Sequence, residues 1–160
     1  MKIQRDFIGL AGEYLVLSRL TAQGLLASLG PRNKSTIDIF VTSEQGNTTW
    51  MIQVKSRLYG PKENEWMVSE ENSKNANPNL IYCFVDLQNK PEKVYVIPSK
   101  KVVQVLSEAH TAQMKKPMKD GSKRTKHQGR KLKNKFIVDI KSAPHGWMEK
   151  YCEKWDVFVK

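Results

Sequence analysis

Four polar residues in the first third of the chain have side chains that together could hydrolyse a phosphodiester bond: Glu13, Asp38, Gln53 and Lys55. Carboxylate and amide oxygens are the hard ligands that Mg²⁺ prefers, and Mn²⁺ accepts the same ligands. A lysine beside such an ion can orient a water molecule or offset the charge that develops on the phosphate. Asp38, Gln53 and Glu13 are therefore candidate metal ligands, and all four are candidate catalytic residues.

Two neighbouring runs are expected to position three of these residues. Thr36–Thr42 is β-branched and apolar, Trp50–Ser56 alternates between apolar and polar residues, and the polar turn between them completes a predicted β-hairpin. Gln53 and Lys55 are two residues apart, so their side chains leave the same face of their strand. Asp38 is expected inside the first strand, across the hairpin from both. The side chains expected to be buried on the opposite face are those of Trp50, Ile52 and Val54.

Glu13 lies in the middle of a predicted helix. Asp6 is expected to cap this helix, apolar residues recur along it at three- and four-residue steps, and Gly24 predicts its end after about Gln23. Glu13 would then lie near the apolar side of the helix. From there its carboxylate could complete a metal site directly or through water.

The same four residues also fit an ordinary structural role. An aspartate and a lysine on paired strands often form a cross-strand ion pair. A glutamate on a first helix is usually solvated. Spacing alone leaves both interpretations open.

The remaining elements predict an α+β fold with a mixed β-sheet flanked by at least two helices. Ser99 is expected to cap a second long helix that ends near His110. Further strands are expected at Leu25–Leu29, Glu65–Val68, Leu80–Asp86, Val94–Ile97 and Phe136–Ile140, a closing helix at Trp147–Lys154 and an extended tail at Trp155–Val159.

The positive charge is concentrated in one segment. The 160 residues, which we expect to form a single domain over 1–160, carry a formal net charge of +11. Residues 115–141 hold 11 basic and two acidic residues, a net charge of +9. We interpret 115–135 as a basic loop or insertion that contacts a nucleic-acid backbone, although a charged run can also be simply solvated. The residues expected to bind nucleic acid are Lys123, Arg124, Lys126, Arg130, Lys131 and Lys133.

Other classes of protein are disfavoured. No apolar run reaches the roughly 18–20 residues that span a bilayer, so no membrane partner is expected. The N-terminal residues lack the apolar core of a signal peptide. Cys83 and Cys152 stand alone and form neither a disulfide framework nor a zinc motif. A cytoplasmic location is the resulting expectation.

Several short motifs, in order, resemble those of the PD-(D/E)XK nuclease superfamily. They are Gly9-x-x-Gly12-Glu13-Tyr14, Ile37-Asp38-Ile39, Ile52-Gln53-Val54-Lys55-Ser56, the run Leu80–Asp86 and the run Val94–Ser99. Within that superfamily, the chain resembles a small bacterial branch with a Q-x-K motif. The likeness covers most of residues 9–110.

The resemblance implies an αβββαβ core of restriction-endonuclease type and metal-dependent cleavage of DNA, with Mg²⁺ as the cofactor and Mn²⁺ as a substitute. It assigns Asp38 as a metal ligand, Lys55 as the motif lysine and Glu13 as the helix glutamate. Gln53 replaces the usual acidic ligand, and Ile37 replaces the proline before Asp38.

Because a neutral amide holds a divalent ion less strongly than a carboxylate, one alternative is a catalytically weak or inactive nucleic-acid-binding module that keeps the fold. A separate alternative is an RNA-cleaving toxin, since nothing in the sequence separates RNA from DNA. DNA is favoured over RNA as the partner. A homodimer is a further expectation, by analogy with nucleases that cut both strands.

Overall fold

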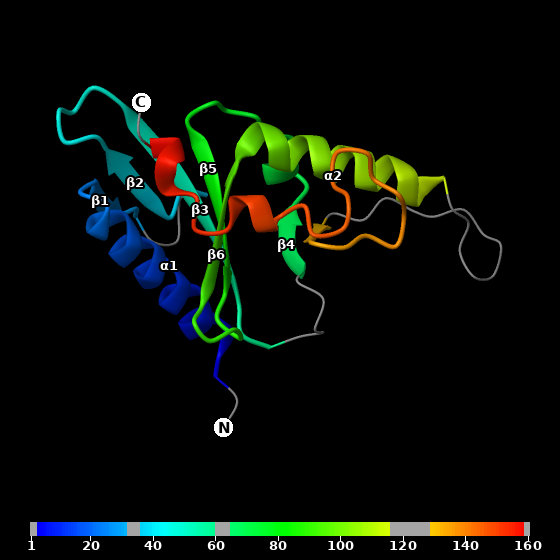
Figure 1. The fold of residues 1–160 in the computed structure, drawn as a ribbon, viewed down its shortest axis with the longest axis horizontal. Helices are drawn as coiled ribbons and strands as arrows, with labels where there is room; N and C mark the ends of the chain where they lie inside the picture. The colour runs from blue at the N-terminus through cyan, green and yellow to red at the C-terminus, as the bar shows by residue number, and fades with distance from the viewer. Residues whose placement is uncertain (1–2, 32–35, 60–64, 116–128, 159–160) are drawn as a thin grey trace.

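A computed structural model describes residues 3–31, 36–59, 65–115 and 129–158 (Figure 1). In these residues, five strands form a main sheet in the order β1-β2-β3-β5-β6, and two further strands pair as a ribbon, β4-β7. The elements are α1 (Arg5–Ala22), β1 (Leu26–Leu29), β2 (Ile39–Thr42), β3 (Thr49–Arg57), β4 (Glu65–Ser69), β5 (Leu80–Asp86), β6 (Lys93–Pro98), α2 (Ser99–Met114) and β7 (Gly129–Lys133), with 3₁₀ turns η1 (Asn72–Lys74), η2 (Glu149–Tyr151) and η3 (Trp155–Phe158).

The main sheet is mixed, as expected. β3 and β5 run parallel, and each of the other neighbouring pairs is antiparallel. Ile39 of β2 lies opposite Ile52 of β3, which confirms the predicted hairpin. The α+β prediction, with a central mixed sheet and flanking helices, is therefore confirmed.

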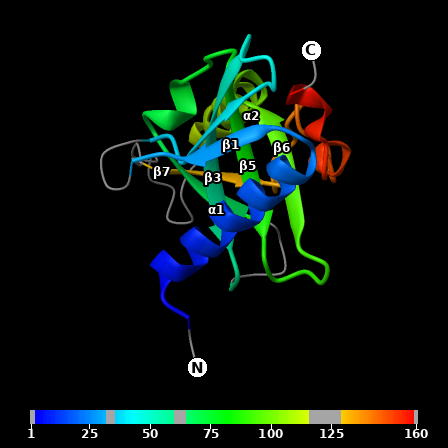
Figure 2. The same ribbon diagram turned by 90° about the vertical axis from the view of Figure 1, so that its left-hand side faces the viewer.

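The two long helices cover opposite faces of the sheet (Figures 1 and 2). α1 packs on β1, β2 and β3 through Gly12, Val16 and Leu20. Its apolar core includes the three side chains of β3 predicted to be buried, together with η3, where the rings of Trp50 and Phe158 meet edge to face at 5.5 Å. The alternation along β3 therefore predicts its buried face correctly, since Trp50, Ile52 and Val54 are 2%, 0% and 8% exposed.

The second face is covered by α2 and the β4–β7 ribbon. Trp66 of β4 and Leu132 of β7 are buried there against Tyr82 and Phe84 of β5. The Trp66 indole also donates a hydrogen bond from Nε1 to the Val85 carbonyl at 3.1 Å. This bond ties the ribbon to the main sheet.

The ribbon corrects the sequence analysis in the basic segment. β7 begins at Gly129, inside the stretch 115–135 that was predicted to be a loop, whereas Phe136–Ile140 was predicted to be a strand and is not one. The pairing is stabilised by opposite charges, since Glu65 of β4 lies opposite Lys133 of β7. Residues 116–128 lie outside the described residues.

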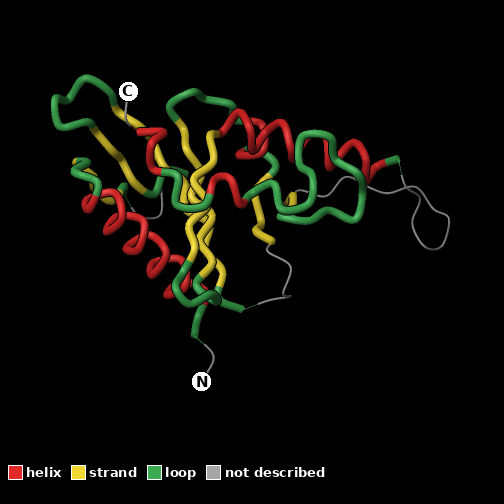
Figure 3. Tube along the Cα trace, viewed as in Figure 1, coloured by secondary structure: helices red, strands yellow, loops and turns green. Residues whose placement is uncertain are grey.

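The predicted helix caps and the C-terminal elements also differ in the structure. Gln4 holds the N-cap position of α1 without a side-chain hydrogen bond, and Asp6 lies in the first turn. Ser99 donates its hydroxyl to the Asn77 carbonyl at 2.5 Å, so it fixes the start of α2 to a loop instead of capping the helix. The predicted closing helix is reduced to η2, and η3 replaces the expected extended tail (Figure 3).

No helix within the described residues has the length and apolar character needed to cross a membrane.

Candidate active site

Asp38 lies where β2 separates from β3. Its backbone amide donates to the carbonyl of Ile52 at 2.9 Å, although Ile52 is already the register partner of Ile39, so the regular pairing of β2 with β3 stops here. Its carboxylate then accepts the next hydrogen bond, from the Val54 amide to Oδ2 at 2.7 Å. Asp38 thus occupies an acceptor position that a strand carbonyl would ordinarily fill, and its carboxylate is fixed at the edge of the sheet.

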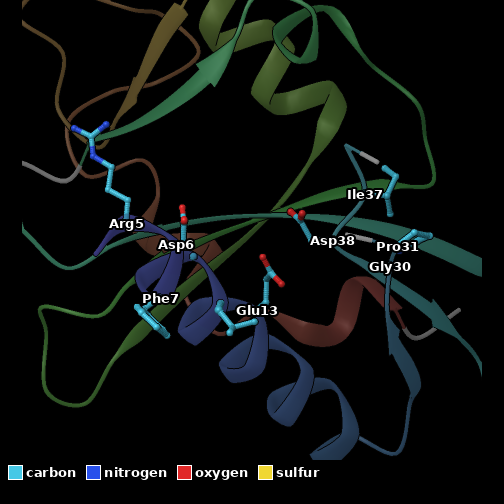
Figure 4. A pocket seen from close by; sticks show the side chains of 10 residues that line it. Arg5, Asp6, Phe7, Glu13, Gly30, Pro31, Ile37 and Asp38 are labelled. Atoms are coloured by element: carbon cyan, nitrogen blue, oxygen red, sulfur yellow. The ribbon is translucent and has the colours of Figure 1, made fainter. Parts of the chain in front are cut away.

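Glu13 and Asp38 line the same pocket, which has a volume of about 470 Å³. Figure 4 shows both carboxylates turned toward the space between α1 and the segment that leads into β2. The residues that line the pocket are Arg5, Asp6, Phe7, Gly9, Leu10, Glu13, Gly30, Pro31, Ile37 and Asp38. The structure therefore brings together two of the predicted metal ligands, from elements that are 25 positions apart in the sequence.

Gly12 allows α1 to approach β3 this closely. A Cβ atom built on Gly12 would lie 1.8 Å from Ser56 Oγ and 2.8 Å from Ser56 Cβ, which is closer than real atoms approach. Ser56 follows Lys55 on β3. The contact therefore fixes Glu13, the next residue of the helix, beside the strand that carries Gln53 and Lys55.

Lys55 and Asp38 influence each other's charge. Burial raises the pKa of the Asp38 carboxyl, while the Val54 hydrogen bond and the positive charge of Lys55 lower it. Burial lowers the pKa of the Lys55 ammonium, and the charge of Asp38 opposes that shift. Both groups are partly shielded from water. A bound cation or phosphate would therefore have a strong effect on the free energies of their charged forms.

Gln53 is nearly inaccessible, at 4% exposed, and shares its face of β3 with Lys55. Among the described residues, neither Gln53 nor Lys55 belongs to the set that lines the pocket. Gln53 and Lys55 therefore lie outside the set of residues that surrounds Glu13 and Asp38.

The donor set fits a hard divalent cation whose coordination is partly water. The described residues contain no group of three His, Cys, Asp or Glu side chains close enough to hold a metal. Asp6, Glu13 and Asp38 all line the pocket, but they are not close enough together to act as three ligands, so an ion bound through one or two of these carboxylates would complete its coordination with water. Mg²⁺ suits such a set because it binds through one or two carboxylates and keeps several waters.

A second cation on β3 was missed in the sequence analysis. Arg57, two residues after Lys55, donates from Nη2 to Asp86 Oδ2 at 2.7 Å, and both side chains are buried. Asp86 also accepts hydrogen bonds from the Gln88 amide and the Asn89 side chain, and Arg57 lies over the Trp66 ring at 5.2 Å. The sequence does contain a signal for this pair, because Asp86 ends an apolar strand. A carboxylate buried at that position requires a partner of opposite charge.

Three of the predicted nucleic-acid-binding residues lie on β7 and have acidic neighbours. Lys131 and Lys133 contact Glu65 at 2.9 and 3.0 Å, and Arg130 lies 3.8 Å from Glu70. The hydrogen bond from Lys131 is the main reason that the pKa of Glu65 is lowered. The other three, Lys123, Arg124 and Lys126, lie outside the described residues.

Comparison with known proteins identifies the fold. No family model and no curated protein matches the sequence. Among solved structures, the chain is similar to a bacterial homing endonuclease, I-Ssp6803I, with a TM-score of 0.61 and 14% sequence identity over 98% of this chain and 94% of that one. The arrangement of α1, the five-stranded sheet and α2 is therefore that of a nuclease-like α+β fold.

Proposed function

We propose that this protein is a metal-dependent nuclease of the PD-(D/E)XK type that hydrolyses phosphodiester bonds in DNA. The observation that carries the proposal is the pocket that both Glu13 and Asp38 line, in a fold similar to that of a homing endonuclease. The ordered motifs around Asp38, Gln53 and Lys55 agree with it.

Each residue has a role that follows from its position. Asp38 and Glu13 would hold Mg²⁺ or Mn²⁺, with Gln53 as a neutral third ligand. The ion, when bound, would activate a water molecule and stabilise negative charge on the phosphate. Lys55 contributes positive charge close to Asp38 in a partly desolvated site, where a charge acts more strongly than in water.

DNA is the proposed substrate for two reasons. The similar solved structure is a homing endonuclease. The strongly basic segment 115–141 can neutralise the phosphates of a long duplex, which makes binding favourable and dependent on salt.

The proposal is tested by incubating supercoiled plasmid with the protein and Mg²⁺ or Mn²⁺, beside Asp38→Asn, Glu13→Gln and Lys55→Met. We expect cleavage by the wild type, none in the presence of EDTA, and a loss of at least about a hundredfold in Asp38→Asn, because even residues that only orient a ligand contribute 10- to 100-fold. Equal cleavage by the wild type and all three variants would show that the pocket is not the active site.

A non-catalytic binding module is the second candidate, and Gln53 favours it. With a neutral third ligand and no close group of three acidic, His or Cys side chains in the described residues, the ion would bind weakly. DNA binding that weakens with salt, without cleavage and without calorimetric heat on adding Mn²⁺, would support this candidate. Gln53→Glu should then increase the affinity for Mn²⁺, because it adds a third carboxylate. The same assays with labelled RNA test the remaining substrate class.

A further inference from the structure

The pocket that Glu13 and Asp38 line has an apolar part that metal binding does not require. Of the ten described residues that line it, four are charged and four are apolar, the apolar ones being Phe7, Leu10, Pro31 and Ile37. In the view of Figure 4, Phe7 lies on one side of the two carboxylates and Ile37 on the other. A site for an ion and a phosphate alone would be polar throughout, because both are strongly hydrated. The apolar part therefore indicates a ligand that has an apolar part as well.

Phe7 is the aromatic residue of this apolar part. Its side chain is 61% exposed, and it belongs to neither of the two apolar cores formed by the described residues. Six residues separate Phe7 from Glu13 along α1, which corresponds to about 9 Å along the helix axis. A phosphate beside Glu13 and a base in contact with Phe7 can therefore belong to the same nucleotide or to adjacent ones.

A base inside a continuous duplex is not available to such a ring. Both of its faces are covered by neighbouring base pairs, so an enzyme that needs the base must take it out of the stack or act on a single strand. Unpaired bases expose a flat face, and proteins bind them by stacking aromatic side chains on that face. An aromatic ring in the wall of the pocket therefore suits a DNA strand whose bases are unpaired beside the phosphate to be cleaved.

We propose that the pocket accommodates an unpaired nucleotide of the DNA, with its base stacked on Phe7 and a phosphate beside Glu13 and Asp38. The inference rests on the proposed function, because it takes DNA as the substrate. It narrows that function to DNA with unpaired bases next to the cleaved bond, such as a duplex with a single-stranded arm. The pocket volume of about 470 Å³ lies within the range of roughly 300–1,000 Å³ that is typical of pockets for small ligands, which suits one nucleotide and not a duplex.

The charges of the pocket agree with a nucleotide as the ligand. Arg5 supplies the one positive charge among the described residues that line the pocket. It is two residues before Phe7, and Figure 4 shows both at the same end of α1. Because a guanidinium can bind a phosphate through two parallel hydrogen bonds, Arg5 is placed to hold the phosphate that follows or precedes the stacked base.

The test is fluorescence anisotropy with DNAs that share one duplex and differ in their single-stranded arm. One arm is ordinary, and the other keeps its phosphates but lacks its bases; each is made with 5′ and 3′ polarity. Ca²⁺ replaces Mg²⁺, because it takes the same oxygen ligands while slowing cleavage. We expect the wild type to bind the ordinary arm more tightly than the abasic arm of the same polarity, for one polarity at least, on the order of tenfold or more, since stacking of one base contributes that much.

Variants of α1 assign the difference to Phe7. Phe7→Ala should bind the two arms with equal affinity, whereas Phe7→Trp should keep the difference because an indole also stacks on bases. The matched control is Tyr14→Ala, because Tyr14 is an exposed ring of the same helix, at 50%, and does not line the pocket. Thermal melts should show that all three variants are folded.

A wild type that binds the ordinary and abasic arms equally at both polarities overturns the proposal. A Phe7→Ala variant that keeps the difference overturns it too, as does a Tyr14→Ala variant that loses it. Because the readout is binding, it is separate from the test of nuclease activity. Discrimination between the arms without plasmid cleavage in Mg²⁺ or Mn²⁺ would refute the nuclease proposal alone, and plasmid cleavage by a protein that ignores the missing bases would refute this inference alone.

Discussion

β3 carries two cations on one face, Lys55 and Arg57, and each has a carboxylate nearby. Arg57 and Asp86 form a closed pair, joined directly at 2.7 Å, buried, and completed by the Gln88 amide, the Asn89 side chain and the Trp66 ring. Lys55 and Asp38 interact through their charges, and among the described residues no direct ion pair joins them.

The difference separates a structural pair from a candidate reactive one. Asp86 has hydrogen-bond donors on both oxygens, so it has little capacity left for a ligand. Asp38 uses one oxygen for the Val54 amide and lies at a pocket that it shares with Glu13. β3 thus carries, two residues apart, one buried ion pair that supports the fold and one pair coupled only through charge, which leaves a carboxylate at a pocket.

The largest expected effect is on stability, at the closed pair. Asp86→Ala should lower the free energy of unfolding by about 3–5 kcal/mol, because it leaves the buried Arg57 charge without its partner. Asp38→Ala should change it by about 1 kcal/mol or less, since the lost hydrogen bond is offset by removal of a desolvated charge. Urea unfolding measures the free energy of unfolding of both variants. Equal decreases would contradict the proposed difference between the Arg57–Asp86 and Lys55–Asp38 pairs.

The second-largest effect is expected at the contact between Gly12 and Ser56, which places Glu13 beside β3. Gly12→Ala should destabilise the fold by about 1–3 kcal/mol, because the new methyl group overlaps Ser56, and it should weaken Mn²⁺ binding by displacing Glu13. Gly9→Ala is the matched control: nothing lies within 4 Å of its added Cβ, so it should gain about 0.5–1 kcal/mol. The double variant Gly12→Ala/Ser56→Gly should recover both properties. A Gly12→Ala variant that melts and binds metal like Gly9→Ala would show that the close approach is unimportant.

The open pair predicts a pH dependence. A metal competes with the proton for Asp38, so binding should be lost as the pH falls through the pKa of Asp38, which burial holds above the ordinary value. Lys55→Met removes a charge that lowers this pKa, so the midpoint of Mn²⁺ binding should move to higher pH. Calorimetry across a pH series measures it. Lys101→Met is the control, because the burial-lowered pKa of Lys101 is coupled to Lys150 and Glu108; a shift of similar size there would refute the link between Lys55 and Asp38.

The smallest effect is expected at the β4–β7 ribbon, where Glu65 forms partly exposed ion pairs with Lys131 and Lys133. Glu65→Gln should release Lys131 and Lys133 and raise DNA affinity a few-fold at low salt, with a slightly steeper dependence on salt. The cost to stability should be about 1 kcal/mol or less. Fluorescence anisotropy over a salt series tests it, and an unchanged affinity would indicate that these lysines serve only the ribbon.

The sequence predicts the centre of the fold better than its periphery, for physical reasons. The alternation of β3 and the apolar run of β5 report burial directly, so both strands and the buried face of β3 are read from local pattern. β7 has one buried apolar residue, Leu132, and its pairing partner is β4, more than sixty positions earlier in the chain, whose Glu65 contacts Lys131 and Lys133. A local pattern does not contain that pairing.

The site shows the same limit. The motifs identify Asp38 and Glu13 as candidates, and the structure places both in one pocket, which spacing alone left open. The sequence identifies Gly12 only as part of a motif. It does not predict the close contact with Ser56, which forms where the helix packs on the sheet. Roles that arise from close approach between distant segments require coordinates.

The bond between the Val54 amide and the Asp38 carboxylate limits how this protein can evolve. One side chain both completes the hydrogen bonding of the sheet edge and presents an oxygen to the pocket. Asparagine at this position can still accept the hydrogen bond from Val54 but presents no carboxylate to the pocket, whereas alanine loses both roles. A lineage that abandons the chemistry is therefore expected to retain a polar acceptor at this position, so that asparagine at position 38 would mark relatives that kept the fold after losing the reaction.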